Sequence, residues 1–204
     1  GDWSSDVCSS DLVRFITIAD ENFGADREAA WQVASGLGKL GVSWYAGGVR
    51  TRTVSKESLL HWKANGCVSV IYGIESGSQK MLDVMEKNAT VQENLDALKW
   101  ASECGLNSIV QLVIGMPGET DETIRESIEF LKRVAPYLLM WKDRAPSEMI
   151  SINYAQALPG TPLYEYAREK GHIGKTVDEE EKYLLRISDT DAYAEDHFLN
   201  YTGY

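Results

Sequence analysis

Two short apolar runs of the chain each end in a glycine-bearing loop that carries a glutamate. The first, Val68–Gln79, reads VSVIYGIESGSQ, and the second, Ser108–Thr120, reads SIVQLVIGMPGET. Both runs are apolar and rich in β-branched residues, which is typical of strands buried in a parallel sheet. Parallel α/β folds place ligands and catalytic groups at the carboxyl ends of their strands. Glu75 and Glu119 are therefore candidates for ligand binding or chemistry.

Each loop also has a purely structural interpretation. Glu75 could cap the helix that is predicted to start near Ser78. Glu119 precedes a helix N-terminus, where a carboxylate is favoured by the helix dipole in any case. Gly115 and Pro117 could serve only to form a turn. The residues alone leave these alternatives open.

The elements that would position these loops alternate regularly along the chain. Strands are predicted at Val13–Ala19, Val42–Val49, Val68–Ile74, Ser108–Ile114 and Met149–Ala157. Helices are predicted after Asp26, Ser55, Ser78, Thr90 (in a capping box with Glu93), Thr120 and Pro162. This βα order predicts a parallel sheet with right-handed crossovers. Five units do not close an eight-stranded barrel, so an open or partial barrel or a doubly wound sheet is expected.

Composition excludes some classes of protein. The chain has 204 residues, is 44% hydrophobic and carries a net charge of −11, which argues against a duplex nucleic-acid binder. No apolar run is long enough for a membrane span, and no secretory signal is recognisable. The three cysteines are widely spaced, without a CxxC cluster, which favours a reduced, cytoplasmic location.

The first twelve residues differ abruptly in character from the rest. They read GDWSSDVCSSDL, are rich in Ser and Asp, and show no apolar period. The string from Asp2 to Leu12 looks like the in-frame translation of a common sequencing-library adapter. We therefore expect residues 1–12 to be a non-native leader and the natural protein to continue upstream of Val13. An ordinary flexible terminus is the alternative.

Five motifs in order resemble the radical S-adenosylmethionine (SAM) superfamily, within it the branch that usually carries an N-terminal cobalamin-binding domain. The motifs are IADENFGADR, WYAGGVRTR, GCVSVIYGIESGSQKML, GLNSIVQLVIGMPGETDETI and ALPGTPLYEYA. Each motif alone is weak, but five in the correct order, each at a strand end, are specific. The resemblance implies an α/β fold, a partial (βα)6 TIM-like barrel with parallel strands whose first βα unit is missing here. It covers residues 13–171 and leaves 172–204 as an acidic C-terminal extension.

The resemblance also implies a SAM site, residue by residue. Asp20, Glu21 and Asn22 match a loop near the methionyl amine, and Arg52 matches an arginine that pairs with the carboxylate. The remaining positions match the ribose contact (Gly73, Glu75, Ser76) and the adenine contact (Gly115, Pro117, Glu119, Leu158).

These residue types suit their implied roles. A carboxylate holds hydroxyls through charge-assisted hydrogen bonds, arginine presents a planar fork to a carboxylate, and glycine admits a planar ligand. Two bland alternatives stay open, because Asp20 and Asn22 could form an Asx-type turn and Arg52 could be a surface ion-pair residue.

The chain departs from the family pattern at the metal site. The family binds a 4Fe-4S cluster through a CxxxCxxC loop, which is absent from this sequence and is expected upstream of Val13. Cys67 and Cys104 each lie beside a glycine near a helix-to-strand turn, at the wrong end of the barrel, and are interpreted as core residues. We therefore expect this chain to hold no metal and not to cleave SAM by itself.

Three functional hypotheses remain. The first is a fragment of a cobalamin-dependent radical SAM enzyme that methylates or cyclises an unactivated carbon of a small-molecule or lipid-like substrate, with flavodoxin or ferredoxin as electron donor. The second is a cobalamin-independent enzyme, similar to a methylthiotransferase. The third is a cluster-less, barrel-like binding module.

Overall fold

A computed structural model describes residues 13–138, 146–188 and 202 of the chain. Its strands are β1 (Phe15–Ile18), β2 (Ser43–Val49), β3 (Cys67–Glu75), β4 (Asn107–Ile114) and β5 (Ile150–Tyr154). Its helices are α1 (Arg27–Leu40), α2 (Lys56–Ala64), α3 (Gln79–Val84), α4 (Val91–Glu103), α5 (Asp121–Val134), α6 (Pro162–Glu169) and α7 (Val177–Ser188), with 3-10 turns η2 (Thr51–Thr53), η3 (Ala135–Tyr137) and η4 (Pro146–Met149).

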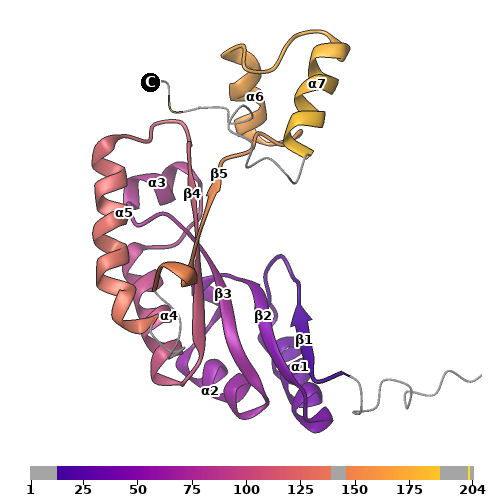
Figure 1. Cartoon of the computed structure of the whole chain (residues 1–204), viewed down its shortest axis with the longest axis vertical. Helices are drawn as coiled ribbons and strands as arrows, with labels where there is room; N and C mark the ends of the chain where they lie inside the picture. The colour runs from indigo at the N-terminus through magenta and orange to yellow at the C-terminus, as the bar shows by residue number, and fades with distance from the viewer. Residues whose placement is uncertain (1–12, 139–145, 189–201, 203–204) are drawn as a thin grey trace, which may run out of the picture. The chain divides into compact units, whose positions relative to one another are not determined.

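The strands form one five-stranded sheet in the order β1-β2-β3-β4-β5 (Figure 1). The pairs β1–β2, β2–β3 and β3–β4 are parallel. A doubly wound sheet would reverse its strand order at a switch point, whereas here the order follows the sequence. The predicted α/β class and partial TIM-like barrel are therefore confirmed.

Local sequence signals explain most helix ends. Asp26 caps α1 by accepting from Ala29 N, and Gly41 ends the helix in the left-handed conformation. Ser55 and Thr90 each start a helix with a complete capping box. The predicted starts of α1, α2 and α4 are confirmed.

Some predicted boundaries differ from the structure. β3 extends to Glu75, and β5 covers only Ile150–Tyr154 of the longer run predicted. In α1, Ala30 and Ala34 are buried, while Trp31 is 37% exposed and stacks on His61 with ring centroids 3.5 Å apart. Residues 1–12, 139–145, 189–201 and 203–204 lie outside the described residues, so the expectation of a non-native leader falls there.

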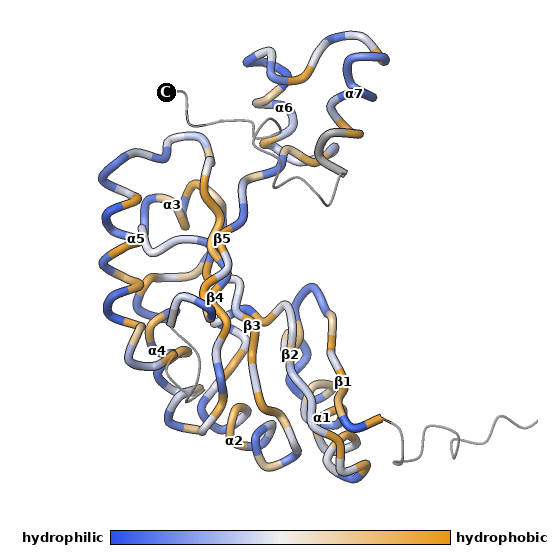
Figure 2. Tube along the Cα trace, viewed as in Figure 1, coloured by the Kyte–Doolittle hydropathy of each residue, from blue (hydrophilic) through white to orange (hydrophobic). Residues whose placement is uncertain are grey.

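The chain divides into two compact units, of which the first comprises residues 1–112 and 121–152. Along one side of its sheet, α1, α2, α4 and α5 follow one another, each in contact with the next (Figure 1). Its core contains Trp44, Trp62 and Tyr72, all almost fully buried. Figure 2 shows β3 and β4 as largely hydrophobic segments, whereas α5 alternates hydrophilic and hydrophobic residues. That alternation is expected of a helix that covers a core with one face.

The second unit comprises residues 113–120 and 153–204 and has a small core of its own. The rings of Tyr164 from α6 and Tyr183 from α7 meet edge to face, 6.2 Å apart. The Tyr183 hydroxyl donates to Ala157 O at 2.7 Å, and Tyr164 donates to Glu180. The C-terminal extension thus contributes a helix, α7, to this unit. No helix in the described parts of the chain is long and apolar enough to cross a membrane.

Two adjacent glycines let β2 pass against the end of β1. Gly48 has φ +67, and a Cβ placed there would lie 1.7 Å from Asp20 O; one placed at Gly47 would lie 2.8 Å from Ile18 O. Only glycine tolerates both the left-handed backbone and this approach. The position of the loop after β1 therefore depends on Gly48.

We predict that Gly48→Ala lowers the free energy of unfolding by at least about 2 kcal/mol, because the new methyl group meets the Asp20 carbonyl in a strained backbone. Gly36→Ala is the matched control. Gly36 lies inside α1 and has no neighbour within 4 Å of an added Cβ, so this change is expected to stabilise by about 0.5–1 kcal/mol. Urea unfolding followed by tryptophan fluorescence measures both; equal effects would contradict the prediction.

Candidate functional site

The loop after β1 presents a buried acceptor without a partner. Asn22 N donates to Asp20 Oδ1 at 2.9 Å, so the Asx-type turn is formed. Phe23 anchors the loop by packing on Trp44 and Trp62, with ring centroids 5.9 and 5.0 Å away. Asn22 Oδ1 is buried and has no hydrogen-bond partner among the described residues. A buried polar atom left unpaired is costly, and a bound ligand is one way to satisfy it.

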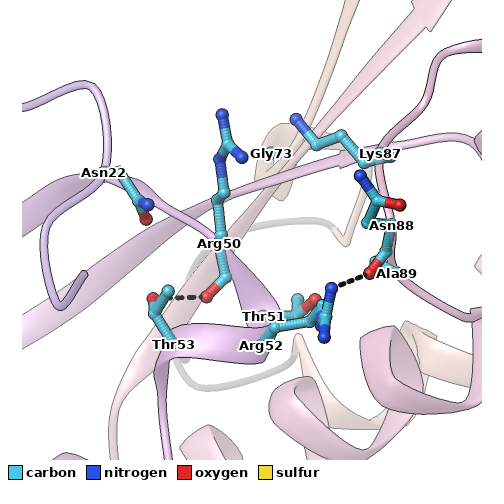
Figure 3. A pocket seen from close by; sticks show the side chains of 9 residues that line it. All are labelled: Asn22, Arg50, Thr51, Arg52, Thr53, Gly73, Lys87, Asn88 and Ala89. Atoms are coloured by element: carbon cyan, nitrogen blue, oxygen red, sulfur yellow. Dashed lines mark hydrogen bonds between the residues drawn. The ribbon is translucent and has the colours of Figure 1, made fainter.

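Two arginines flank the turn that follows β2, and they differ in their partners. Arg52 donates to Asn88 O and lies 3.9 Å from Glu93 Oε1 with its side chain 53% exposed. Arg52 is therefore a surface residue near an acidic partner, as the alternative interpretation of the sequence predicted. The Arg50 side chain has no hydrogen bond or ion pair within the described parts of the chain, and Figure 3 shows it extending on the same side as Asn22 and Lys87.

Glu75 is the last residue of β3 and has an unusual backbone. Its φ is 63°, in the left-handed region that non-glycine residues seldom adopt. The register between β3 and β4 shifts between Gly73 and Glu75, which is a bulge-like irregularity. Glu75 Oε1 accepts from Lys87 Nζ at 2.5 Å, and the two side chains are only 19% and 21% exposed. Glu75 is thus paired with a cation and does not act as a helix cap.

Ser76 is buried and makes its contacts with the loop and α5. Its hydroxyl lies 3.1 Å from Ser127 Oγ and accepts from Ser78 N at 3.1 Å. The next residue, Gly77, lies so close to α5 that an added Cβ would be 2.5 Å from Phe130 Cβ. The Ser76 side chain therefore fixes the turn after Glu75.

These strand ends surround a pocket of about 340 Å³ (Figure 3). Its lining residues are Asn22, Arg50, Thr51, Arg52, Thr53, Gly73, Lys87, Asn88 and Ala89. Three of them are cations, although the chain as a whole carries −11. Such a lining suits a ligand with an anionic group.

The pocket unites Asn22, Arg52 and Gly73, which the sequence singled out, with residues that it did not. Glu75 adjoins the pocket through its partner Lys87, whereas Asp20 and Glu21 are exposed and do not line it. Arg50 was missed although it follows the same strand as Arg52, two positions earlier. Lys87 lies in a loop with no pattern that would mark it.

The turn after β4 belongs to the second unit. Gly115 and Gly118 have φ +88 and +80, and an added Cβ at either would meet nothing within 4 Å. Glu119 is buried, and its Oε2 accepts from Gly115 N at 2.7 Å. Burial raises the pKa of the Glu119 carboxyl, and the Gly115 hydrogen bond partly offsets that effect. Leu158 of the same unit is 49% exposed.

The two described cysteines do not form a metal site. Cys67 begins β3 and Cys104 ends α4, so both lie at the amino-terminal side of the sheet while the pocket lies at the carboxyl ends. Both thiols are free and buried. Burial raises the pKa of the Cys67 thiol to about 12, which disfavours the thiolate that binds metals. Within the described ranges, no three His, Cys, Asp or Glu side chains gather as metal ligands.

Comparison with known proteins decides the family. The sequence profile of the radical SAM superfamily matches residues 12–131, more than half of the chain. The chain belongs to the radical SAM superfamily. Enzymes of this superfamily use S-adenosylmethionine and a 4Fe-4S cluster, which agrees with the family that the five sequence motifs suggested.

Individual relatives are more distant and longer. An uncharacterized methyltransferase of Pyrococcus horikoshii is 30% identical over 76% of this chain and 32% of its own length. The anaerobic magnesium-protoporphyrin IX monomethyl ester cyclase of Cereibacter sphaeroides is 29% identical over 79% of this chain and 25% of its own length. The chain thus spans about a quarter to a third of these curated relatives.

A solved structure supports the fold. The radical SAM methyltransferase TsrM from Kitasatospora setae, with cobalamin and a [4Fe-4S] cluster bound, superimposes with a TM-score of 0.62. It is 18% identical, and the match covers 80% of this chain and 32% of that protein. At this identity the likeness concerns the fold alone.

We predict that Cys67 and Cys104 contribute nothing to iron binding, because both are buried and lie away from the pocket. Anaerobic iron–sulfur reconstitution would be compared between the chain and its Cys67→Ala/Cys104→Ala variant. Equal iron content and equal visible absorbance are expected. A cluster signal that disappears in the variant would contradict the prediction.

Proposed function

We propose that this chain is the SAM-binding part of a radical SAM enzyme and that the carboxyl ends of β1, β2 and β3 bind the amino-acid and ribose portions of SAM. The observation that carries the proposal is the cationic pocket with one unpaired buried acceptor at its wall. SAM has a carboxylate, an ammonium group and a ribose diol close together. The pocket and the adjoining Glu75 together offer a complementary group for each of these.

The ammonium group is assigned to Asn22. Its Oδ1 is a buried acceptor without a partner, and an ammonium donor would satisfy it. The Asx-type turn with Asp20 holds the Asn22 backbone in place, so the side chain needs little reordering on binding. Asp20 and Glu21 are assigned a role in holding this loop and in the local charge around the ammonium.

The carboxylate of SAM is assigned to the two arginines. Arg50 has an uncommitted guanidinium at the pocket, and Arg52 lies beside it with one donor used by Asn88 O. A planar guanidinium fork matches a carboxylate with two parallel hydrogen bonds. We give Arg50 the direct contact and Arg52 a supporting one.

The ribose is assigned to Glu75. One of its carboxylate oxygens is engaged by Lys87, and the other has no partner among the described residues. Hydrogen bonds from hydroxyls to a carboxylate are stronger than those between neutral groups. Gly73 and Ser76 support this contact, Gly73 by leaving space and Ser76 by fixing the turn.

The family resemblance alone supports an adenine-binding role for the turn at Gly115–Glu119 and for Leu158. An added Cβ at Gly115 or Gly118 would meet nothing within 4 Å, and Pro117 and the half-exposed Leu158 offer apolar groups that suit a planar base. Glu119 accepts from Gly115 N and so holds the turn in shape.

SAM bound with a reduced 4Fe-4S cluster supplies a 5′-deoxyadenosyl radical in this superfamily. The described cysteines do not fit such a cluster, so we assign this chain the binding and orientation of SAM and expect no SAM cleavage from it alone. For the whole protein we propose cobalamin-dependent methylation or cyclisation of a small molecule, with a flavodoxin- or ferredoxin-like electron donor. The methyltransferase and cyclase names of the relatives support this.

We predict that Glu75→Gln and Arg50→Met each raise the dissociation constant for SAM about tenfold, since each removes a charge-assisted hydrogen bond. Equilibrium dialysis with radiolabelled SAM measures the effect. Glu103→Gln is the control, because Glu103 forms a comparable but exposed pair with Lys56 at 2.6 Å. Unchanged affinity in both pocket variants, or no binding by the parent chain, would refute the proposed function.

A further inference from the structure

The pair formed by Glu75 and Lys87 is unusual among the ion pairs of the described residues. The side chains of Glu75 and Lys87 are 19% and 21% exposed, whereas those of Lys56 and Glu103 are 52% and 39% exposed. Exposed pairs contribute little because water screens them, but a shielded pair holds its partners firmly. Removing one partner of a shielded pair leaves the other charge without compensation.

The backbone turns Glu75 toward this partner at an energetic cost. Its left-handed φ of 63° and the irregular register with β4 both aim the side chain away from the ordinary alternation of a strand. Backbone strain of this kind typically costs about 1–3 kcal/mol and is concentrated at functional sites. The position of the Glu75 carboxylate is therefore specified by more than strand geometry.

The loop that carries Lys87 is fixed from several sides. Glu86 and Asn88, its neighbours, have φ values of 51° and 53°, and Lys87 N donates to Leu82 O at 3.0 Å. Arg52 donates to Asn88 O, which ties the loop to the turn after β2. The strained and anchored loop thus holds Lys87 beside Glu75.

Gly73 leaves the space that this pair occupies. A Cβ at Gly73 would lie 2.7 Å from Glu75 Oε1 and 3.5 Å from Lys87 Nζ. The absence of a side chain at Gly73 therefore accommodates the ion pair beside the pocket.

We infer that Lys87 is a positioning residue for ribose recognition, which holds Oε1 of Glu75 so that Oε2 is left to accept from the ribose hydroxyls. The inference rests on the proposed SAM site. It adds a residue of the pocket wall that acts on the ribose through Glu75. Its consequence is that Lys87 sets the preference for a ligand with ribose hydroxyls over one without them.

The test compares adenosine with 2′,3′-dideoxyadenosine, which lacks both hydroxyls, by titration of the 204-residue chain followed by NMR. The ratio of the two dissociation constants is measured for the parent chain, Lys87→Met, Glu75→Gln and the double variant. Lys87→Arg tests rescue by a conservative change. Lys56→Met is the control, because it breaks an exposed pair.

We expect Lys87→Met to reduce the preference for adenosine about tenfold, Lys87→Arg to restore part of it, and the double variant to match Glu75→Gln alone. A general loss of structure would weaken both ligands equally and leave the ratio unchanged. If Glu75→Gln lowers the ratio but Lys87→Met does not, the role of Lys87 is refuted while the proposed function stands. If the parent chain binds neither nucleoside or does not distinguish them, the ribose assignment fails, and the role of Lys87 with it. If the Lys87→Met chain does not fold, the Lys87→Arg and Glu75→Gln chains provide the test. A Lys87→Arg chain that binds adenosine and 2′,3′-dideoxyadenosine equally well would overturn the inference.

Discussion

Parallel pairing of β1, β2 and β3 brings the ends of these strands to one edge of the sheet, and the proposed site depends on this constraint. Because the strands run in one direction, three loops distant in sequence converge there. The glycines at 47 and 48 allow the closest approach, where β2 passes the backbone at the end of β1. This close approach brings Asn22 and Arg50 to the same pocket.

Once the strand ends are together, charge and strain define what the pocket can bind. Three cations line it, and the only nearby carboxylate that we assign to the ligand, Glu75, already has a partner in Lys87. Residues 75, 86 and 88 have left-handed φ values, which residues other than glycine seldom adopt. Such positions are costly to maintain, which fits a surface selected to hold a ligand.

The sequence predicted the architecture well, because strand periodicity, capping boxes and left-handed glycines are local signals that the tertiary structure respects. It predicted the neighbourhood of Asn22, Arg52 and Gly73 for the same reason, since the first two follow predicted strands and Gly73 lies near the end of another. It could not choose between Arg50 and Arg52, because that choice depends on the 3-10 turn that directs the two side chains to different partners. The sequence also could not predict the role of Lys87, because helix α3 and a loop with left-handed residues separate Lys87 from its ion-pair partner Glu75. Ser76 was predicted at the ribose contact; its hydroxyl lies 3.1 Å from Ser127 Oγ, a contact with α5 that the sequence pattern does not indicate.

The central claim is that SAM binds at the carboxyl ends of β1, β2 and β3. Backbone amide NMR shifts of the chain, recorded during titration with SAM, test it most directly. The account predicts shifts concentrated at residues 20–24, 50–53 and 73–76, with little change at Cys67 and Cys104 on the opposite side of the sheet. Shifts confined to other regions, or none at saturating SAM, would contradict it.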